Sequence, residues 1–223
     1  MILIQEYTPK NPITLIGYEA GICYNSDISK LSKNYQRGLD CLKSNHGRAL
    51  EFVQVYMTID GYSARCMREL YTHIGGSPTR LQASTRYIDY NDFNYYTPPL
   101  NKSQKEIYQN TMNDIALKYK ELLELGVSKE DAANILPLGM MSKIVIRTNL
   151  RNLIDIMKVR QCNRAYKEMR DLMKEIKKVL SAYSSEWKYL VKNYMPIKCE
   201  ELGYCPETHG CGYIGVKDEK QSN

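Results

Sequence analysis

Alternation of apolar and polar residues predicts strands at four places along the chain. The clearest is "LEFVQVYMTID", residues 50–60, where every second residue places an apolar side chain on one face: Val53, Val55, Met57 and Ile59. "MILIQEY", residues 1–7, and "KIVIRTN", residues 143–149, also read as strands. "RYIDYNDF", residues 86–93, predicts a fourth strand that enters the loop "YYTPP".

Capping residues and helical spacing predict the helices. Residues 61–76 favour a helix with Ser63 as its cap, an i,i+4 pair of Arg65 with Glu69, and an end at Gly75 and Gly76. Residues 103–126 favour a long helix that opens on a capping box of Ser103 and Glu106. Further helices are expected over 128–131, before Pro137, and over 150–160 and 163–192. The pattern predicts an α+β fold in which a mixed sheet packs with long helices.

The composition excludes several classes of protein. The chain has 223 residues, of which 43% are hydrophobic and 25% are charged, as in ordinary globular proteins. It lacks an apolar run long enough for a membrane span, and its first residues do not resemble a secretory signal. Seven cysteines without such a signal favour free thiols in a cytoplasmic protein with no membrane partner. We expect one domain over residues 1–214, with a cysteine-bearing segment at 195–214 and a polar tail at 215–223.

The net charge of +6 suits either nucleic acid or a small anionic ligand. Basic residues are interleaved with acidic ones and form no long stripe, which favours a phosphorylated small molecule over nucleic acid. "YTHIGGSPTRLQASTRY", residues 71–87, is the candidate segment, because a glycine turn exposes backbone N–H groups and arginine suits bidentate phosphate binding. An ordinary basic loop is the alternative.

Four motifs, in the same order along the chain, resemble the flavin-dependent thymidylate synthases. "NHGRALEF", "IDGYSARCMRELYTHI" and "ASTRY" are similar to the family's pattern "GHxxxxEH", "EGxSRAxxxQLxRHR" and "SxRY". The fourth motif, "LPLGMMSKIVIRTNLRNLIDIMKVRQCNRAYKEM", resembles the block that contains the family's "NxR". Upstream of these four, a further stretch, "LIGYEAGICYNS", resembles the family's N-terminal helix. The resemblance covers most of the chain.

The resemblance implies a role for individual residues. Residues at or beside the family's flavin positions are His46, Arg48, Glu51, His73, Asn149 and Arg151. Residues expected to bind the nucleotide substrate are Glu69, Arg80, Ser84, Thr85, Arg86 and Arg160. Ser84 and Arg86 match the loop that holds the nucleotide phosphate. Arg160 matches an arginine that reaches the uracil ring, where it would stabilise developing negative charge as the catalytic residue.

The resemblance also implies the reaction. It would be reductive methylation of dUMP to dTMP, with FAD as cofactor and with methylenetetrahydrofolate and NADPH as co-substrates, in a homotetramer whose sites lie between subunits. No protein nucleophile is expected. Two alternatives stay open: a related flavoenzyme that modifies another pyrimidine nucleotide, for instance by hydroxymethylation, and a non-catalytic nucleotide-binding homologue.

Three family arginines are replaced in this chain. Thr72 and Ile74 flank the central histidine of the family's Arg-His-Arg triplet, and Ala133 stands just before the "LP" motif. Losing one charge-assisted contact costs about 1.5–3 kcal/mol, so other arginines would have to compensate. Arg80 is the favoured candidate, inside a loop that is two residues longer than usual; Arg48 and Arg147 are the others.

The C-terminal segment collects Cys199, Cys205, His209 and Cys211. These residue types can bind zinc, but their spacing fits no standard pair of ligands, and surface thiols are the alternative. We therefore predict no metal.

Overall fold

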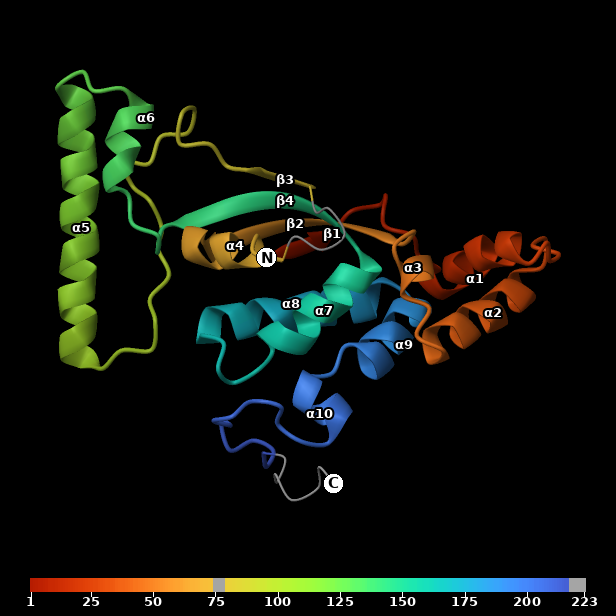
Figure 1. Ribbon diagram of the computed structural model, residues 1–223. Coiled ribbons are helices and arrows are strands. Elements are labelled where there is room, and N and C mark those ends of the chain that lie inside the picture. Colours follow the sequence, from red (N-terminus) through yellow and green to blue (C-terminus); the bar gives the residue numbers. More distant parts are fainter. Residues whose placement is uncertain (74–78, 217–223) are drawn as a thin grey trace. The chain divides into compact units, whose positions relative to one another are not determined.

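The computed structural model describes residues 1–73 and 79–216, and it has the predicted α+β fold (Figure 1). Four strands form one sheet in the order β1-β2-β4-β3. Their bounds are Ile2–Ile4 for β1, Gln54–Ser63 for β2, Thr79–Gln82 for β3 and Met141–Asn149 for β4. In β2 and just before it, the predicted apolar face is confirmed, because Val53, Val55, Met57 and Ile59 are all buried.

The helices account for most of the remaining chain. They are α1 (Pro12–Cys23), α2 (Leu31–Lys43), α3 (Gly47–Leu50), α4 (Ala64–Leu70), α5 (Lys102–Glu124), α6 (Lys129–Ala132), the 3-10 helix η1 (Ala133–Ile135), α7 (Leu150–Arg160), α8 (Lys167–Tyr183), α9 (Ser185–Tyr194) and α10 (Lys198–Leu202). Within residues 1–73 and 79–216, no helix is both long and apolar enough to cross a membrane.

The chain forms two compact units. The first unit comprises Met1, Thr58–Thr72 and Arg80–Ile146, and the second comprises Ile2–Met57, His73–Thr79 and Arg147–Asn223. In the first unit, α5 packs beside α6 and η1 (Figure 1). Their shared core is built on aromatic and methionine side chains: Tyr90, Phe93, Met112, Tyr119 and Met140.

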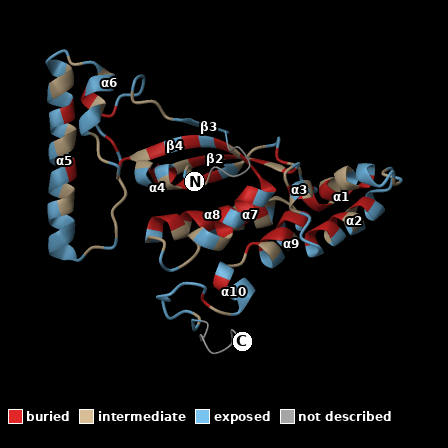
Figure 2. Ribbon diagram, in the orientation of Figure 1, coloured by how far each residue is buried: buried red, intermediate tan, exposed pale blue. Residues whose placement is uncertain are grey.

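The second unit begins with a tightly packed pair of helices, α1 and α2. Two glycines permit their close approach: a Cβ on Gly17 would lie 1.7 Å from the backbone oxygen of Asn34, and one on Gly38 would lie 1.9 Å from that of Ile13. Further along the chain, α7 and α8 each bury one face and expose the other (Figure 2).

Residues 183–187 bind the N-terminal segment of the same unit. Glu186 is only 9% exposed, and its carboxylate accepts hydrogen bonds from the backbone N–H groups of Ile13 and Thr14, at 2.7 and 3.0 Å. It also accepts one from the Thr14 hydroxyl, at 2.6 Å. Nearby, Trp187 donates its indole N–H to the oxygen of Pro9, at 2.8 Å. Glu186 thus caps α1 from a helix 173 residues away.

Glu186→Ala is expected to lower the free energy of unfolding by about 1.5–3 kcal/mol, the range for hydrogen bonds to a charged group. The first N–H groups of α1 would lose their acceptor. Urea denaturation followed by circular dichroism measures the change. Glu106→Ala, on an exposed position of α5, is the control and should change stability by less than about 0.5 kcal/mol. Equal effects from both variants would contradict the capping role.

Two helix starts were predicted correctly and one was not. Ser63 accepts from the Cys66 N–H at the start of α4, and Ser128 accepts from that of Asp131 at the start of α6. The Ser103–Glu106 capping box is wrong. Asn101 caps α5 instead, with Gln104 as its partner, because the Asn101 side chain accepts from the Gln104 N–H while Gln104 accepts from the Asn101 N–H.

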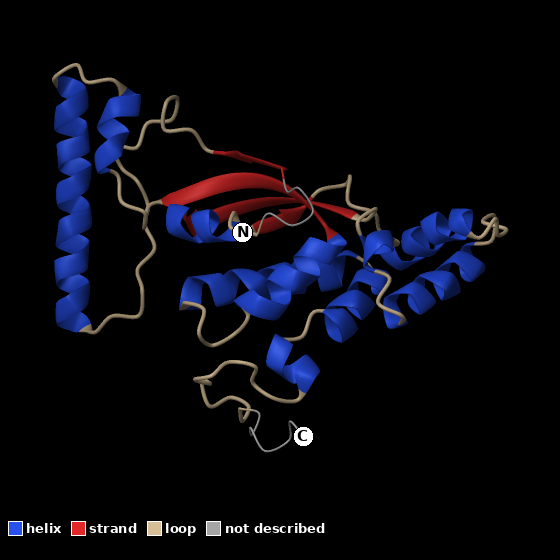
Figure 3. Ribbon diagram, viewed as in Figure 1, coloured by secondary structure: helices blue, strands red, loops and turns tan. Residues whose placement is uncertain are grey.

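Other predicted elements are shorter or absent. Residues 86–93 form no strand (Figure 3), because Tyr90 and Phe93 are buried in the core of the first unit rather than paired in the sheet. The expected helix over 163–192 is broken at Ser184, whose extended backbone ends α8 and whose hydroxyl caps α9. Helix α4 ends at Leu70, whereas Gly75 and Gly76 lie outside the described residues. Helix α2 and strand β3 were not predicted.

Candidate functional site

The residues expected to bind the flavin all belong to the second unit. Three of them, His46, Arg48 and Glu51, lie in or beside the short helix α3, and two, Asn149 and Arg151, lie at the start of α7. Helices α3 and α7 contact each other. His73 completes the set from the end of the first described range.

The start of α7 is fixed by Asn149. Its side-chain oxygen accepts from the Asn152 N–H at 2.8 Å, and the residue is 4% exposed. The N–H of Leu150 donates to the backbone oxygen of Val53 at 2.9 Å, which joins α7 to the segment leading into β2. Asn149 therefore sets the position of the helix that contains Arg151 and Arg160; its direct contact with a cofactor stays a prediction.

Arg151 links α7 to α3 through an ion pair. One guanidinium nitrogen lies 2.7 Å from a carboxylate oxygen of Glu51, and both side chains are about half exposed. Gly47 leaves room for this arginine, because a Cβ there would lie 3.1 Å from the guanidinium carbon. The family's "NxR" arginine is thus held beside α3 with part of its guanidinium open to solvent.

Arg160 and His73 meet although 87 residues separate them. The Nε–H of Arg160 donates to Nε2 of His73 at 2.7 Å. Burial lowers the pKa of His73, the positive charge of Arg160 lowers it further, and Asp155 opposes them. Nε2 can accept this bond only when the imidazole is neutral, so His73 holds Arg160 in place in its neutral form.

We expect activity to fall on the acid side of the pH profile, with an apparent pKa below the usual histidine value of 6.5. Above the folded-state pKa, His73 is neutral and accepts from Arg160; as pH falls through it, protonation removes the acceptor and places two positive charges together. Initial rates from pH 5 to 9 measure this effect. His73→Gln keeps an acceptor that does not titrate, so it should lose the acid limb. If His73→Gln keeps the same acid limb as the wild type, the limb belongs to a group other than His73.

Two cavities flank α3, both formed within the second unit. The smaller, about 420 Å³, has largely apolar walls with His46 and Arg48 at its edge; Cys23, Tyr24 and Phe52 also line it. The larger, about 820 Å³, is lined by α2, α3, α7, α9 and α10, and Arg48 and Arg151 both face it. Both volumes fall in the range of about 300–1,000 Å³ that is common for small-molecule sites.

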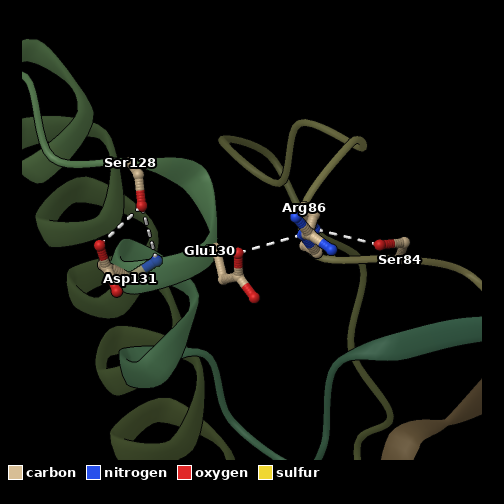
Figure 4. A network of polar contacts seen from close by, with 5 residues as sticks. All are labelled: Ser84, Arg86, Ser128, Glu130 and Asp131. Carbon is tan, nitrogen blue, oxygen red and sulfur yellow. Dashed lines mark hydrogen bonds and ion pairs between the residues drawn. The ribbon is translucent and has the colours of Figure 1, made fainter.

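The residues expected to bind the nucleotide belong to the first unit, except Arg160. Arg86 forms an ion pair with Glu130, with 3.1 Å between Nε and a carboxylate oxygen, and its backbone N–H donates to the Ser84 hydroxyl at 3.2 Å (Figure 4). The two charged side chains are 61% and 62% exposed. Such exposed pairs contribute little, about 0–1 kcal/mol, so a phosphate can displace Glu130 from Arg86 at small cost.

Arg80 lies in β3, not in a loop as expected. Its guanidinium carbon is 3.2 Å from the centre of the Tyr71 ring, a cation–π contact. The Tyr71 hydroxyl donates to Gln82 at 2.6 Å, and Gln82 donates to Ser142 at 2.9 Å. Arg80 is thus anchored along the edge of the sheet while remaining exposed.

The remaining predicted positions form simple local contacts. Glu69 forms the expected pair with Arg65, at 3.7 Å. The Thr72 hydroxyl donates to the Glu69 backbone oxygen at 2.8 Å. Ala133 opens η1. Ile74 lies outside the described residues, and the role of Thr85 stays a prediction. Arg147, the third extra arginine, donates to the Thr79 hydroxyl at 3.1 Å.

Several residues that line the larger cavity were missed. They are Lys43, Asn45, Asp155, Lys158, Tyr189, Asn193 and Tyr194. Part of this set carries a signal, because Arg151, Asp155 and Lys158 recur at helical spacing and therefore share a face of α7. The tyrosines of α9 carry no such sequence signal, because their spacing resembles that of any amphipathic helix.

Cys199 and Cys205 are buried, whereas Cys211 is exposed. Burial raises the pKa of the Cys199 thiol. Over residues 1–73 and 79–216, no group of three or more His, Cys, Asp or Glu side chains is arranged to hold a metal ion.

Known proteins are similar to this chain in sequence and in fold. Residues 3–183 match the family model described as "Thymidylate synthase complementing protein". The flavin-dependent thymidylate synthase of Pyrococcus abyssi is 34% identical over 170 residues, which cover 73% of this chain and 68% of the relative. That of Nitratidesulfovibrio vulgaris is 31% identical over 184 residues, which cover 74% and 70%.

Among solved structures, a flavin-dependent thymidylate synthase from Helicobacter pylori, in complex with FAD and dUMP, has the same fold. Its TM-score is 0.68 at 19% identity, and the match covers 87% of this chain and 99% of that one. Together, the family model and the curated relatives show that the chain belongs to the flavin-dependent thymidylate synthase family.

Proposed function

We propose that this chain binds FAD and catalyses the reductive methylation of dUMP to dTMP, with methylenetetrahydrofolate and NADPH as co-substrates. Membership of the family makes the chain a flavin-dependent methyltransferase. The observation that supports the specific activity best is the hydrogen bond from Arg160 to a neutral His73, because it holds the predicted uracil-binding arginine in a defined position.

The residues of the second unit fit a flavin. The smaller cavity offers apolar walls, including Phe52 and Ala49, that suit a planar aromatic ring, and Arg48 at its edge suits a phosphate. His46 and Arg151 are the other side chains that we assign to the cofactor. The chemistry that a bound FAD would supply, in its reduced form, is the hydride for the reaction.

The protein's own residues position and polarise the substrate. Arg86 binds the dUMP phosphate in place of Glu130, so that binding energy distant from the ring orients the ring. Arg160 stabilises negative charge that develops on the uracil, and His73 keeps its guanidinium from rotating away. We also propose that the protein is cytoplasmic and forms a homotetramer whose sites lie between subunits.

A spectrum of the purified protein tests this function. After incubation with FAD and desalting, the folded protein should retain the flavin absorbance bands. The bound flavin, once reduced, should then be reoxidised in the presence of dUMP and methylenetetrahydrofolate. A folded sample that retains no flavin would contradict the proposal.

A second candidate is modification of another pyrimidine nucleotide. It is favoured by Thr72 and Ala133, which remove two of the arginines that the family uses. Mass analysis of the product separates the candidates, because a hydroxymethyl group is one oxygen heavier than a methyl group. This candidate would be favoured if reoxidation of the reduced flavin does not depend on dUMP but depends on another nucleotide.

A further inference from the structure

The end of helix α7 is held by a side chain that the proposed reaction does not use. Arg160 is the last residue of α7, and Gln161, the next residue, is its C-cap. The Gln161 side-chain amide donates to the backbone oxygen of Met157, in the last turn of α7, at 2.8 Å. The final carbonyl groups of a helix lack partners within the helix, so this bond keeps the last turn closed. The backbone of Arg160 is therefore only as well fixed as Gln161.

Lys177, in α8, fixes Gln161 in turn. Its ammonium donates to the Gln161 side-chain oxygen at 2.9 Å and to the backbone oxygen of Met195 at 2.9 Å. Gln161 also donates to that oxygen of Met195, at 3.1 Å. Met195 is the C-cap of α9 and is fully buried. The three bonds therefore join the end of α7, helix α8 and the end of α9 at one point.

Burial makes this junction stronger than a contact at the surface. Lys177 and Gln161 are both partly buried. Burial lowers the pKa of Lys177, and the carboxylate of Glu200 opposes that shift. Hydrogen bonds from a charged donor are stronger than neutral ones, and salt screens a partly buried charge less than an exposed one. Helix α8 is itself anchored in the core by Met173 and Ile176, so Lys177 extends from a fixed support.

We propose that Lys177 and Gln161 are positioning residues for Arg160, which they hold by fixing the end of α7. The inference rests on the proposed function, in which Arg160 stabilises charge on the uracil. His73 holds the guanidinium of Arg160, whereas Lys177 and Gln161 hold the backbone that carries it. Misplacement by about 1 Å can cost about 10²-fold in rate, so neither residue needs to touch the substrate. The match to the family model ends at residue 183, so the contact with Met195 lies outside it.

Lys177→Met removes the ammonium and keeps most of the bulk of the side chain. Lys178→Met is the matched control, because Lys178 is the next residue of α8, has the same charge and is exposed. Proton NMR of the histidine rings reports on Arg160 without a flavin. The chain has three histidines, and His73→Gln identifies the signal of His73. Burial and the charge of Arg160 lower the pKa of His73, so this pKa should rise in Lys177→Met and in Gln161→Met, and should not change in Lys178→Met.

Single-turnover kinetics test the effect on the reaction. Lys177→Met should retain FAD but slow its reoxidation with dUMP and methylenetetrahydrofolate by about 10–10²-fold. Lys178→Met should stay within about twofold of the wild type. In the Arg160→Ala background, Lys177→Met should cause no further loss, because the residue that it positions is gone. Gln161→Met should give the same results, and it replaces Lys177→Met if that variant does not fold.

Two results would overturn the inference. In the first, neither Lys177→Met nor Gln161→Met changes the pKa of His73, or neither changes the rate. In the second, Lys177→Met slows the reaction equally with and without Arg160, which would make its role purely structural. Both results are read from the variants and leave the proposed function standing. Failure of the proposed function shows in the wild type, as missing flavin or as reoxidation that does not need dUMP, and it would refute both.

Discussion

Arg160→Ala is expected to lower kcat by about 10²–10³-fold, the effect of removing one preorganised group that stabilises developing charge. The variant loses both the guanidinium and its hydrogen bond to His73. FAD absorbance should remain, because none of the cavity walls around α3 includes Arg160. Steady-state kinetics with dUMP, together with the flavin spectrum, separate loss of chemistry from loss of cofactor.

Arg164→Ala is the matched control for this change. Arg164 lies four residues further on and forms an exposed ion pair with Glu207, so its removal should leave kcat within about twofold. His73→Gln provides the second comparison, because it retains an acceptor for Arg160 and should retain most of the activity near neutral pH. If Arg160→Ala and wild type turn over equally, the assignment of Arg160 is wrong.

Arg86→Ala is expected to weaken dUMP binding by about 1.5–3 kcal/mol, the value of a charge-assisted hydrogen bond. Calorimetric titration with dUMP and with deoxyuridine isolates the phosphate contribution, because the nucleoside lacks that group. The variant should bind deoxyuridine like the wild type. Arg68→Ala, an exposed position on α4, is the control for general loss of positive charge in the first unit.

Glu130→Gln should act in the opposite direction. It removes the carboxylate that occupies Arg86, so dUMP should bind more tightly by up to about 1 kcal/mol, with no effect on the nucleoside.

Arg80→Ala tests whether another arginine compensates for the missing ones. A loss of about 1.5–3 kcal/mol for dUMP alone would mean that Arg80 leaves Tyr71 to bind the phosphate. If none of these variants changes the difference in affinity between dUMP and deoxyuridine, the assignment of these residues to the nucleotide is wrong.

Local signals predicted the elements that local contacts stabilise. Strand β2 alternates over residues 54–60 because one face is buried, and Ser63 and Ser128 cap helices within their own turns. Ser184 was missed because the helical pattern continues across it; its hydroxyl donates to the backbone oxygen of Lys10, a contact that local patterns do not reveal. Residues 86–93 have the composition of a strand, yet Tyr90 and Phe93 pack in a core instead.

In the candidate site, too, features that depend on local sequence were predicted and contacts between distant segments were not. The motifs selected residues in or beside α3 and at the start of α7, and the structure brings these two helices into contact; their role in flavin binding stays a prediction. They could not predict that His73 accepts from Arg160, or that Arg86 pairs with Glu130, since both contacts join distant segments. The charges of the larger cavity come from helices that no single motif connects.

The capping of α1 by Glu186 has a consequence for synthesis of the protein on the ribosome. Residues 8–13 emerge before the side chains that bind them. Glu186 accepts from the Ile13 N–H, whereas Tyr183 and Trp187 donate to the backbone oxygens of Thr8 and Pro9. Contacts of such large sequence separation form slowly, and exposed apolar surface invites aggregation meanwhile. Helix α1, whose Ile13 and Ile16 are fully buried in the folded protein, therefore lacks its contacts with α9 until that helix has emerged. Nascent chains that stop short of α9 should consequently be the ones that chaperones retain.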